Sequence, residues 1–131
     1  MALTFYNTAI RRKQIFKPLE LGAAKLYTCG PTVYAPVHLG NLRTFVVSDW
    51  LRRIFRWNNY QVKAVMNVTD VDDKTIKGSR GIGISLASFT GQFEKTFFTD
   101  LDLLNVEPSS AVPHATEYIK PMIEMIEFLL A

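Results

Sequence analysis

The fold is decided by the stretch KLYTCGPTVYAPVHLGNLRTFVVSDWLRRIFRWNNYQVKAVMN, residues 25–67. Its first four residues alternate between two faces, which is the side-chain period of a β-strand. A loop with two prolines and a glycine follows at 29–37. From Leu39 the apolar spacing changes to three and four residues, which predicts an amphipathic helix that ends at the asparagine pair 58–59. Residues 61–67 then form a buried strand.

Strand, helix and strand in succession predict a βαβ unit with parallel strands and a right-handed crossover, and hence an α/β fold. One stripe of the helix is expected to face the sheet, and its members are Leu42, Phe45, Val46, Asp49, Trp50, Ile54 and Phe55. The helix arginines are expected mostly on the other side, namely Arg43, Arg52, Arg53 and Arg56.

Around this unit, residues 3–6 are predicted to form a strand and residues 7–19 a second extended segment. Residues 77–83 are basic and glycine-rich, which indicates a connection. Ser85 can cap a long helix whose phenylalanines recur at four-residue spacing, which indicates core packing. A last helix has Pro121 in its first turn and continues to the final residue without a cap, so we expect the chain to be part of a longer protein.

The composition is that of one globular domain, with 131 residues, 48% hydrophobic and 21% charged. The net charge of +3 is compatible with RNA contact and equally with a solvated surface. A single cysteine excludes an internal disulfide and favours a reducing compartment. No signal-peptide pattern and no apolar run of membrane-spanning length occur in the sequence, so we expect a soluble, cytoplasmic protein without a membrane partner.

The first segment with candidate chemistry is HLGN, residues 38–41, at the start of the predicted helix. A helix N-terminus offers free N–H groups and positive partial charge to a phosphate, and a glycine there lets a nucleotide approach the backbone. Histidine and asparagine side chains donate hydrogen bonds to phosphoryl oxygens. A histidine before a helix is also explained as a simple cap or a surface residue.

Two further segments follow the predicted strands: Cys29 after the first, and NVTDVDDK, residues 67–74, after the second. Ligands bind at the carboxyl ends of parallel strands, so we expect Cys29 and Thr69 to face one crevice. A lone cysteine is also an ordinary small buried residue, and the chain lacks the other ligands that a zinc site needs. The acidic run is equally explained as a helix N-terminus, with Lys74 paired at the surface.

Together, CGPTVY at 29–34, HLGN at 38–41 and NVTDVDDK at 67–74 resemble the start of the cysteinyl-tRNA synthetases, which are class I aminoacyl-tRNA synthetases. The resemblance extends from about Phe5 through the final helix. It implies a Rossmann-like parallel sheet, of which residues 1–131 are the N-terminal part of the catalytic, nucleotide-binding domain. The rest of that domain and the anticodon-binding domain are expected outside this chain.

The resemblance also implies residue roles. Cys29 matches the first zinc ligand of the family, and the other ligands, a cysteine, a histidine and a glutamate, lie in later parts of the family's sequence. The zinc takes the thiolate of substrate cysteine, which the hydroxyl of serine cannot imitate. Gly30 and Thr69 match positions that contact the substrate cysteine.

The tetrapeptide HLGN matches the class I signature usually written His-Ile-Gly-His, and departs from it at the second and fourth residues. By this resemblance His38, Gly40 and Asn41 bind ATP, and Thr32 lies near the adenylate. His38 and Asn41 are the expected catalytic residues, which stabilise the transition state of adenylation. Asn41 can donate a hydrogen bond but cannot carry a charge.

The implied reaction activates cysteine with ATP and Mg²⁺ to cysteinyl-adenylate, and then transfers the cysteinyl group to tRNA(Cys). The full-length protein is expected to be a monomer. The second class I signature, Lys-Met-Ser-Lys-Ser, is absent, so the chain alone is expected to be inactive. Three alternatives stay open: a cysteine ligase of the mycothiol pathway, a non-catalytic nucleotide-binding module that retains the fold, and a half-domain that self-associates through its sheet edge.

Overall fold

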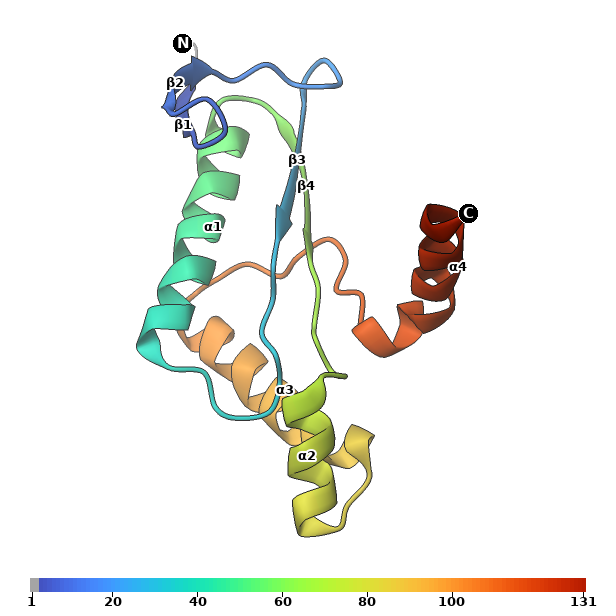
Figure 1. The fold of residues 1–131 in the computed structure, drawn as a ribbon. Coiled ribbons are helices and arrows are strands. Elements are labelled where there is room, and N and C mark those ends of the chain that lie inside the picture. The colour runs from blue at the N-terminus through green and yellow to red at the C-terminus, as the bar shows by residue number, and fades with distance from the viewer. Residues whose placement is uncertain (1–2) are drawn as a thin grey trace.

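The computed structural model describes residues 3–131, and a β3-α1-β4 unit lies at its centre (Figure 1). β3 (Ala23–Thr28) and β4 (Gln61–Met66) pair in parallel, and α1 (Leu39–Trp57) connects them. The predicted parallel βαβ unit is therefore confirmed. Because the strands are parallel, their carboxyl ends lie at the same edge of the sheet, and α1 begins at that edge (Figure 1).

A hairpin of β1 (Thr4–Asn7) and β2 (Arg12–Ile15) packs against the last turns of α1, and so confirms both predicted extended segments. Its contact is aromatic. The rings of Phe5 and Phe16 lie 5.5 and 4.7 Å from the ring of Phe55, centroid to centroid. Figure 1 shows the hairpin at the end of α1 remote from the carboxyl ends of the strands, so it stabilises the unit without entering the ligand-binding edge.

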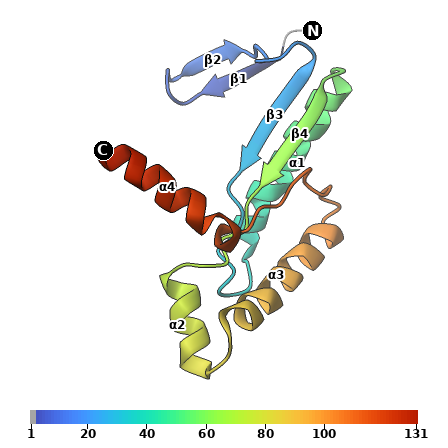
Figure 2. The same cartoon turned by 90° about the vertical axis from the view of Figure 1, so that its right-hand side faces the viewer.

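Below the carboxyl ends of the strands lie α2 (Asp73–Ile82) and α3 (Leu86–Leu103) (Figures 1 and 2). The prediction of a connection at 77–83 is wrong, because nearly all of this segment is helical. Its glycine at position 78 serves packing rather than a turn. A Cβ on Gly78 would lie 2.3 Å from Cζ of Phe89, so glycine lets α2 and α3 approach closely.

The segment after α3 returns to the sheet and adds a third, short parallel element beside β4. Val65 pairs with Ala111 and Val68 pairs with His114 in isolated parallel bridges. Prolines at positions 108 and 113 bracket most of this segment and are typical of a loop. Its place in the sheet depends on hydrogen bonds to β4, which no local pattern reveals.

The chain continues through η1 (Ala115–Tyr118) into α4 (Ile119–Leu130). Both views show α4 standing apart from the sheet (Figures 1 and 2), and all of its residues are exposed. No helix in the part of the chain that the structure describes is long and apolar enough to cross a membrane.

The core lies between α1, α3 and the sheet, where Phe45, Met66, Phe97 and Leu101 are buried together. The phenylalanine stripe of α3 is therefore core, as predicted. On α1 the predicted faces need two corrections, because Trp50 and Ile54 are exposed (62% and 44%) while Arg52 is only 3% exposed. The buried face of α1 in fact consists of Phe45, Asp49, Arg52 and Phe55. An arginine can occupy it because Asp49 compensates its charge.

Candidate functional site

A cavity of about 430 Å³ opens at the carboxyl ends of the strands, between the loop after β3, the first turn of α1 and the start of α2. It brings together five of the residues singled out in the sequence, which are Cys29, Gly30, Thr32, His38 and Asn41. Among the other lining residues, three are polar and had not been assigned to a site from the sequence, namely Tyr34, Thr44 and Lys74. A crevice is thus present at the strand ends, and two helix N-termini border it, but Thr69, which was expected to face it together with Cys29, is not among its lining residues.

His38 is the N-cap of α1, and its side chain is exposed. Nδ1 of His38 accepts a hydrogen bond from the backbone N–H of Gly40 at 3.1 Å. A ring that accepts at Nδ1 carries its proton on Nε2, so a donor remains free to face a ligand. The cap and the phosphate-binding interpretation of this histidine are therefore compatible, because they use different ring nitrogens.

The position of the His38 ring also explains why residue 40 is a glycine. A Cβ at this position would lie 2.9 Å from Cε1 of His38, so glycine leaves room for the capping imidazole. The first turn of α1 contains no acidic residue, so the positive end of the helix dipole is not neutralised from within. The turn is suited to a negatively charged ligand, and the amide of Asn41 adds a further donor beside it.

Cys29 lies at the cavity with an exposed side chain and no disulfide partner. It is therefore not the small buried residue that a lone cysteine usually is. Within residues 3–131 no group of three or more histidine, cysteine, aspartate or glutamate side chains is placed to hold a metal ion. Cys29 alone offers one soft donor to a metal, and a tetrahedral site needs others from outside these residues.

A hydrogen-bond relay joins the ends of β3 and β4 behind the cavity. The Gly30 N–H donates to Oδ1 of Asn67 at 2.9 Å, and Nδ2 of Asn67 donates to Oγ1 of Thr69 at 3.2 Å. Backbone bonds reinforce it, since the Thr69 N–H donates to Pro31 O and the Val33 N–H donates to Thr69 O. Thr69 thus reaches the site through Asn67 and the backbone rather than as part of the cavity wall. Asn67 is a positioning residue that sequence reasoning did not assign.

The acidic residues after β4 organise the backbone. Asp70 is buried and accepts hydrogen bonds from the backbone N–H of Thr116 at 2.9 Å and from its Oγ1 at 2.5 Å. Asp72 is the N-cap of α2, where its carboxylate accepts from the Lys74 N–H at 2.7 Å. The interpretation of the acidic run as a helix N-terminus is therefore confirmed for Asp72.

The sequence suggested that Lys74 pairs at the surface, but in the structure it does not pair with a carboxylate. Its Nζ lies 4.8 Å from the centroid of the Tyr34 ring, and both residues border the cavity. No ion pair involving Lys74 occurs among residues 3–131. Nothing local distinguishes this lysine from a surface residue; only the approach of α2 to the loop after β3 places it here.

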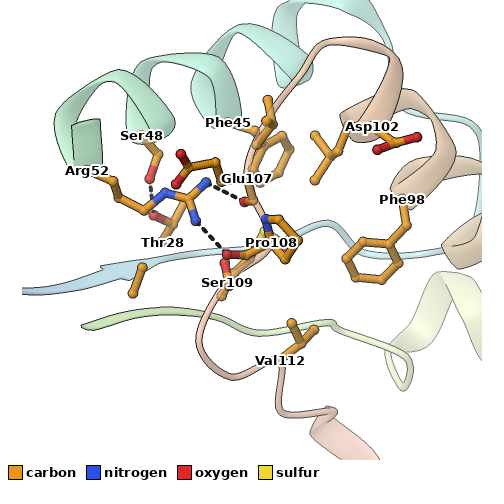
Figure 3. A pocket seen from close by; sticks show the side chains of 14 residues that line it. Thr28, Phe45, Ser48, Arg52, Phe98, Asp102, Glu107, Pro108, Ser109 and Val112 are labelled. Carbon is orange, nitrogen blue, oxygen red and sulfur yellow. Dashed lines mark hydrogen bonds between the residues drawn. The ribbon is translucent and has the colours of Figure 1, made fainter. Parts of the chain in front are cut away.

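A second cavity of about 230 Å³ shares Phe45 with the first and lies between α1, α3, the sheet and the segment after α3 (Figure 3). One of its polar lining residues is Arg52, which donates to Oδ1 of Asp49 at 2.8 Å and to the carbonyl oxygens of Glu107 and Pro108 at 2.6 and 3.1 Å. Beside it, Oγ1 of Thr28 lies 2.6 Å from Oγ of Ser48. The Thr28–Ser48 contact ties α1 to β3 one residue before Cys29, and the Arg52 bonds tie α1 to the segment after α3.

His114 connects the third parallel element to α3. One of its ring nitrogens, Nε2, lies 2.8 Å from Oε1 of Glu94, and this hydrogen bond raises the pKa of His114 above its ordinary value. Partial burial lowers the pKa, but the carboxylates of Glu94, Asp70 and Glu117 act in the other direction. Neither cavity described above includes His114, so its charge affects stability rather than the site.

Comparison with known proteins places this site in a family. Residues 15–131 match the family described as tRNA synthetases class I (C) catalytic domain. The chain belongs to this family, and is therefore part of a class I aminoacyl-tRNA synthetase catalytic domain.

Three curated relatives of the chain are each named Cysteine–tRNA ligase. Those of Methanosarcina mazei and Protochlamydia amoebophila are each 48% identical over 98% of this chain. That of Brachyspira hyodysenteriae is 46% identical over 97% of this chain. The chain spans 27% of the length of each of these relatives.

Proposed function

We propose that this chain is the N-terminal part of the catalytic domain of a cysteine–tRNA ligase. The observation that carries the proposal is the cavity in which an exposed Cys29 thiol and the first turn of α1 meet. The names of the relatives support the choice of substrate. Cys29 can supply a ligand to a zinc ion that would bind a substrate thiolate, and the helix N-terminus can bind a phosphate. Their presence at one cavity suits a reaction that joins cysteine to a nucleotide.

In the first step, a carboxylate oxygen of cysteine attacks the α-phosphorus of ATP, the bond to the β-phosphate oxygen breaks, and pyrophosphate leaves with Mg²⁺. Nε2–H of His38 and the amide of Asn41 donate to phosphoryl oxygens as charge develops on them. The 3′-terminal ribose of tRNA(Cys) then takes the cysteinyl group, and AMP leaves. We assign amino acid binding to Gly30, which lines the cavity, and to Thr69, which acts through Asn67 and the backbone; Thr32 lies beside the adenylate.

Zinc is part of the proposal for the longer protein. Cys29 would supply one ligand, and the other ligands would come from outside residues 3–131. The ion would bind the substrate thiolate and so favour cysteine over serine, because zinc prefers thiolate to hydroxyl. A Cys29→Ser variant should therefore lose zinc content as well as activity.

The test is cysteine-dependent ATP–pyrophosphate exchange by the full-length protein, with serine in place of cysteine as the control. His38→Ala should lower the exchange rate about 100-fold, since it removes one donor to the transition state. Thr96→Ser, a change of one methyl group on the exposed face of α3, should leave it unaltered. Exchange without charging of tRNA(Cys) would favour a ligase with another acceptor, and a folded, zinc-loaded protein without exchange would refute the proposal.

A further inference from the structure

Lys74 is held at the site by two independent arrangements. Its backbone belongs to the first turn of α2, which the Asp72 carboxylate caps. The buried Thr75 completes this cap, because its Oγ1 accepts from the Asp72 N–H at 2.9 Å. Its ammonium group lies over the Tyr34 ring. The base and the tip of the side chain are thus both restrained, which lowers the entropy lost when a ligand binds.

The charge of the cavity points to an anionic ligand. Lys74 is the only side chain among the lining residues that carries a full charge, and no carboxylate lines this cavity. The aromatic face of Tyr34 attracts the ammonium group without neutralising it, unlike an acidic partner. Nε2–H of His38 and the amide of Asn41 are donors from α1 to the same space. An ammonium group and several donors without an acceptor of equal charge suit phosphate oxygens.

We propose that Lys74 is an ATP-binding residue, which contacts the triphosphate from α2 while His38 and Asn41 contact it from α1. This inference rests on the proposed function, and assigns to it a residue outside the His-Leu-Gly-Asn segment. The triphosphate is favoured over the carboxylate of cysteine because it carries several negative charges, which one helix N-terminus only partly compensates.

The first experiment measures ATP–pyrophosphate exchange by full-length Lys74→Met. The KM for ATP should rise about tenfold, because one charge-assisted hydrogen bond is lost, while the KM for cysteine stays unchanged. Lys74→Arg should restore most of the affinity, and Tyr34→Leu should raise the KM for ATP roughly threefold. Lys77→Met is the matched control, since this exposed lysine lies one turn further along α2 and outside the cavity.

A calorimetric titration with ATP separates this inference from the proposed function. If the wild-type protein binds ATP without exchange, the proposed function fails, and a tenfold weaker Kd in Lys74→Met would still support the assignment. An unchanged KM and Kd for ATP in Lys74→Met would overturn it. A rise in the KM for cysteine alone would also overturn it, because the anion at Lys74 would then be the amino acid carboxylate. Equal unfolding midpoints for Lys74→Met and Lys77→Met exclude a folding defect.

Discussion

Replacement of Arg52 by methionine should destabilise the chain by about 3 kcal/mol, although methionine fits the buried space of this side chain. Arg52 is 3% exposed and makes three hydrogen bonds, to Asp49 and to the carbonyls of Glu107 and Pro108. Hydrogen bonds to charged groups contribute roughly 1.5–3 kcal/mol each, and loss of one partner of a buried pair costs about 3–5 kcal/mol.

The lower end of that range applies because Asp49 keeps other partners. Its Oδ2 still accepts from Nε of Arg53 at 2.6 Å, and its Oδ1 accepts from the Glu107 N–H at 3.0 Å. The carboxylate is therefore not left isolated in the core. The two carbonyls can take water from the cavity beside them, which reduces the cost of their lost donors.

The free energy of unfolding is measured in urea. Unfolding is monitored by circular dichroism and by the fluorescence of Trp50 and Trp57 on α1. Arg43→Met is the matched control, because Arg43 is exposed on the same helix and should cost less than about 0.5 kcal/mol. An Arg52→Met protein within about 0.5 kcal/mol of wild type would refute the reasoning. Equal losses in both variants would show that burial and the contacts to the segment after α3 are irrelevant.

Two other predictions concern the ends of the strands. Gly30→Ala should cost about 2–3 kcal/mol in urea unfolding and abolish exchange, because its Cβ would lie 1.6 Å from the backbone oxygen of Asn67 and must displace the backbone of the site; a variant as stable and active as wild type would contradict this. The raised pKa of His114 predicts that its pair with Glu94 stabilises the fold fully below the unfolded-state pKa and is lost as pH rises through the higher folded-state pKa. The stability difference between wild type and Glu94→Gln should therefore shrink as the pH rises above the ordinary histidine value of about 6.5, and a constant difference would exclude the ion pair as its source.

Much of the fold could be read from residues close together in the sequence. The alternation before Cys29, the helical spacing after Leu39 and the cap at Ser85 were all interpreted correctly. Each depends on the backbone period or on a hydrogen bond within one turn, so neighbouring residues contain the information. Five of the singled-out residues also meet at one cavity, because parallel strands place their carboxyl ends at one edge, although Thr69 does not line it.

The predictions were wrong where the position of a residue depends on contacts with residues distant in the sequence. Residues 77–83 were expected to form a connection because of their glycines, yet Gly78 lies in α2 and makes room for Phe89 of α3. Arg52 was placed on the solvent side, because a helical period gives the angle between residues but not the position of Glu107 and Pro108. A local pattern contains neither fact.

The sequence by itself determined the β3-α1-β4 unit, the long helix after Ser85 and the residue types at the strand ends, because these depend on periods, caps and turns within a few residues. Only the tertiary structure decided that Lys74 lies over Tyr34, that Asn67 joins Gly30 to Thr69, and which nitrogen of a capping histidine remains free. These contacts join residues from separate elements, and their geometry exists only once the elements have packed together.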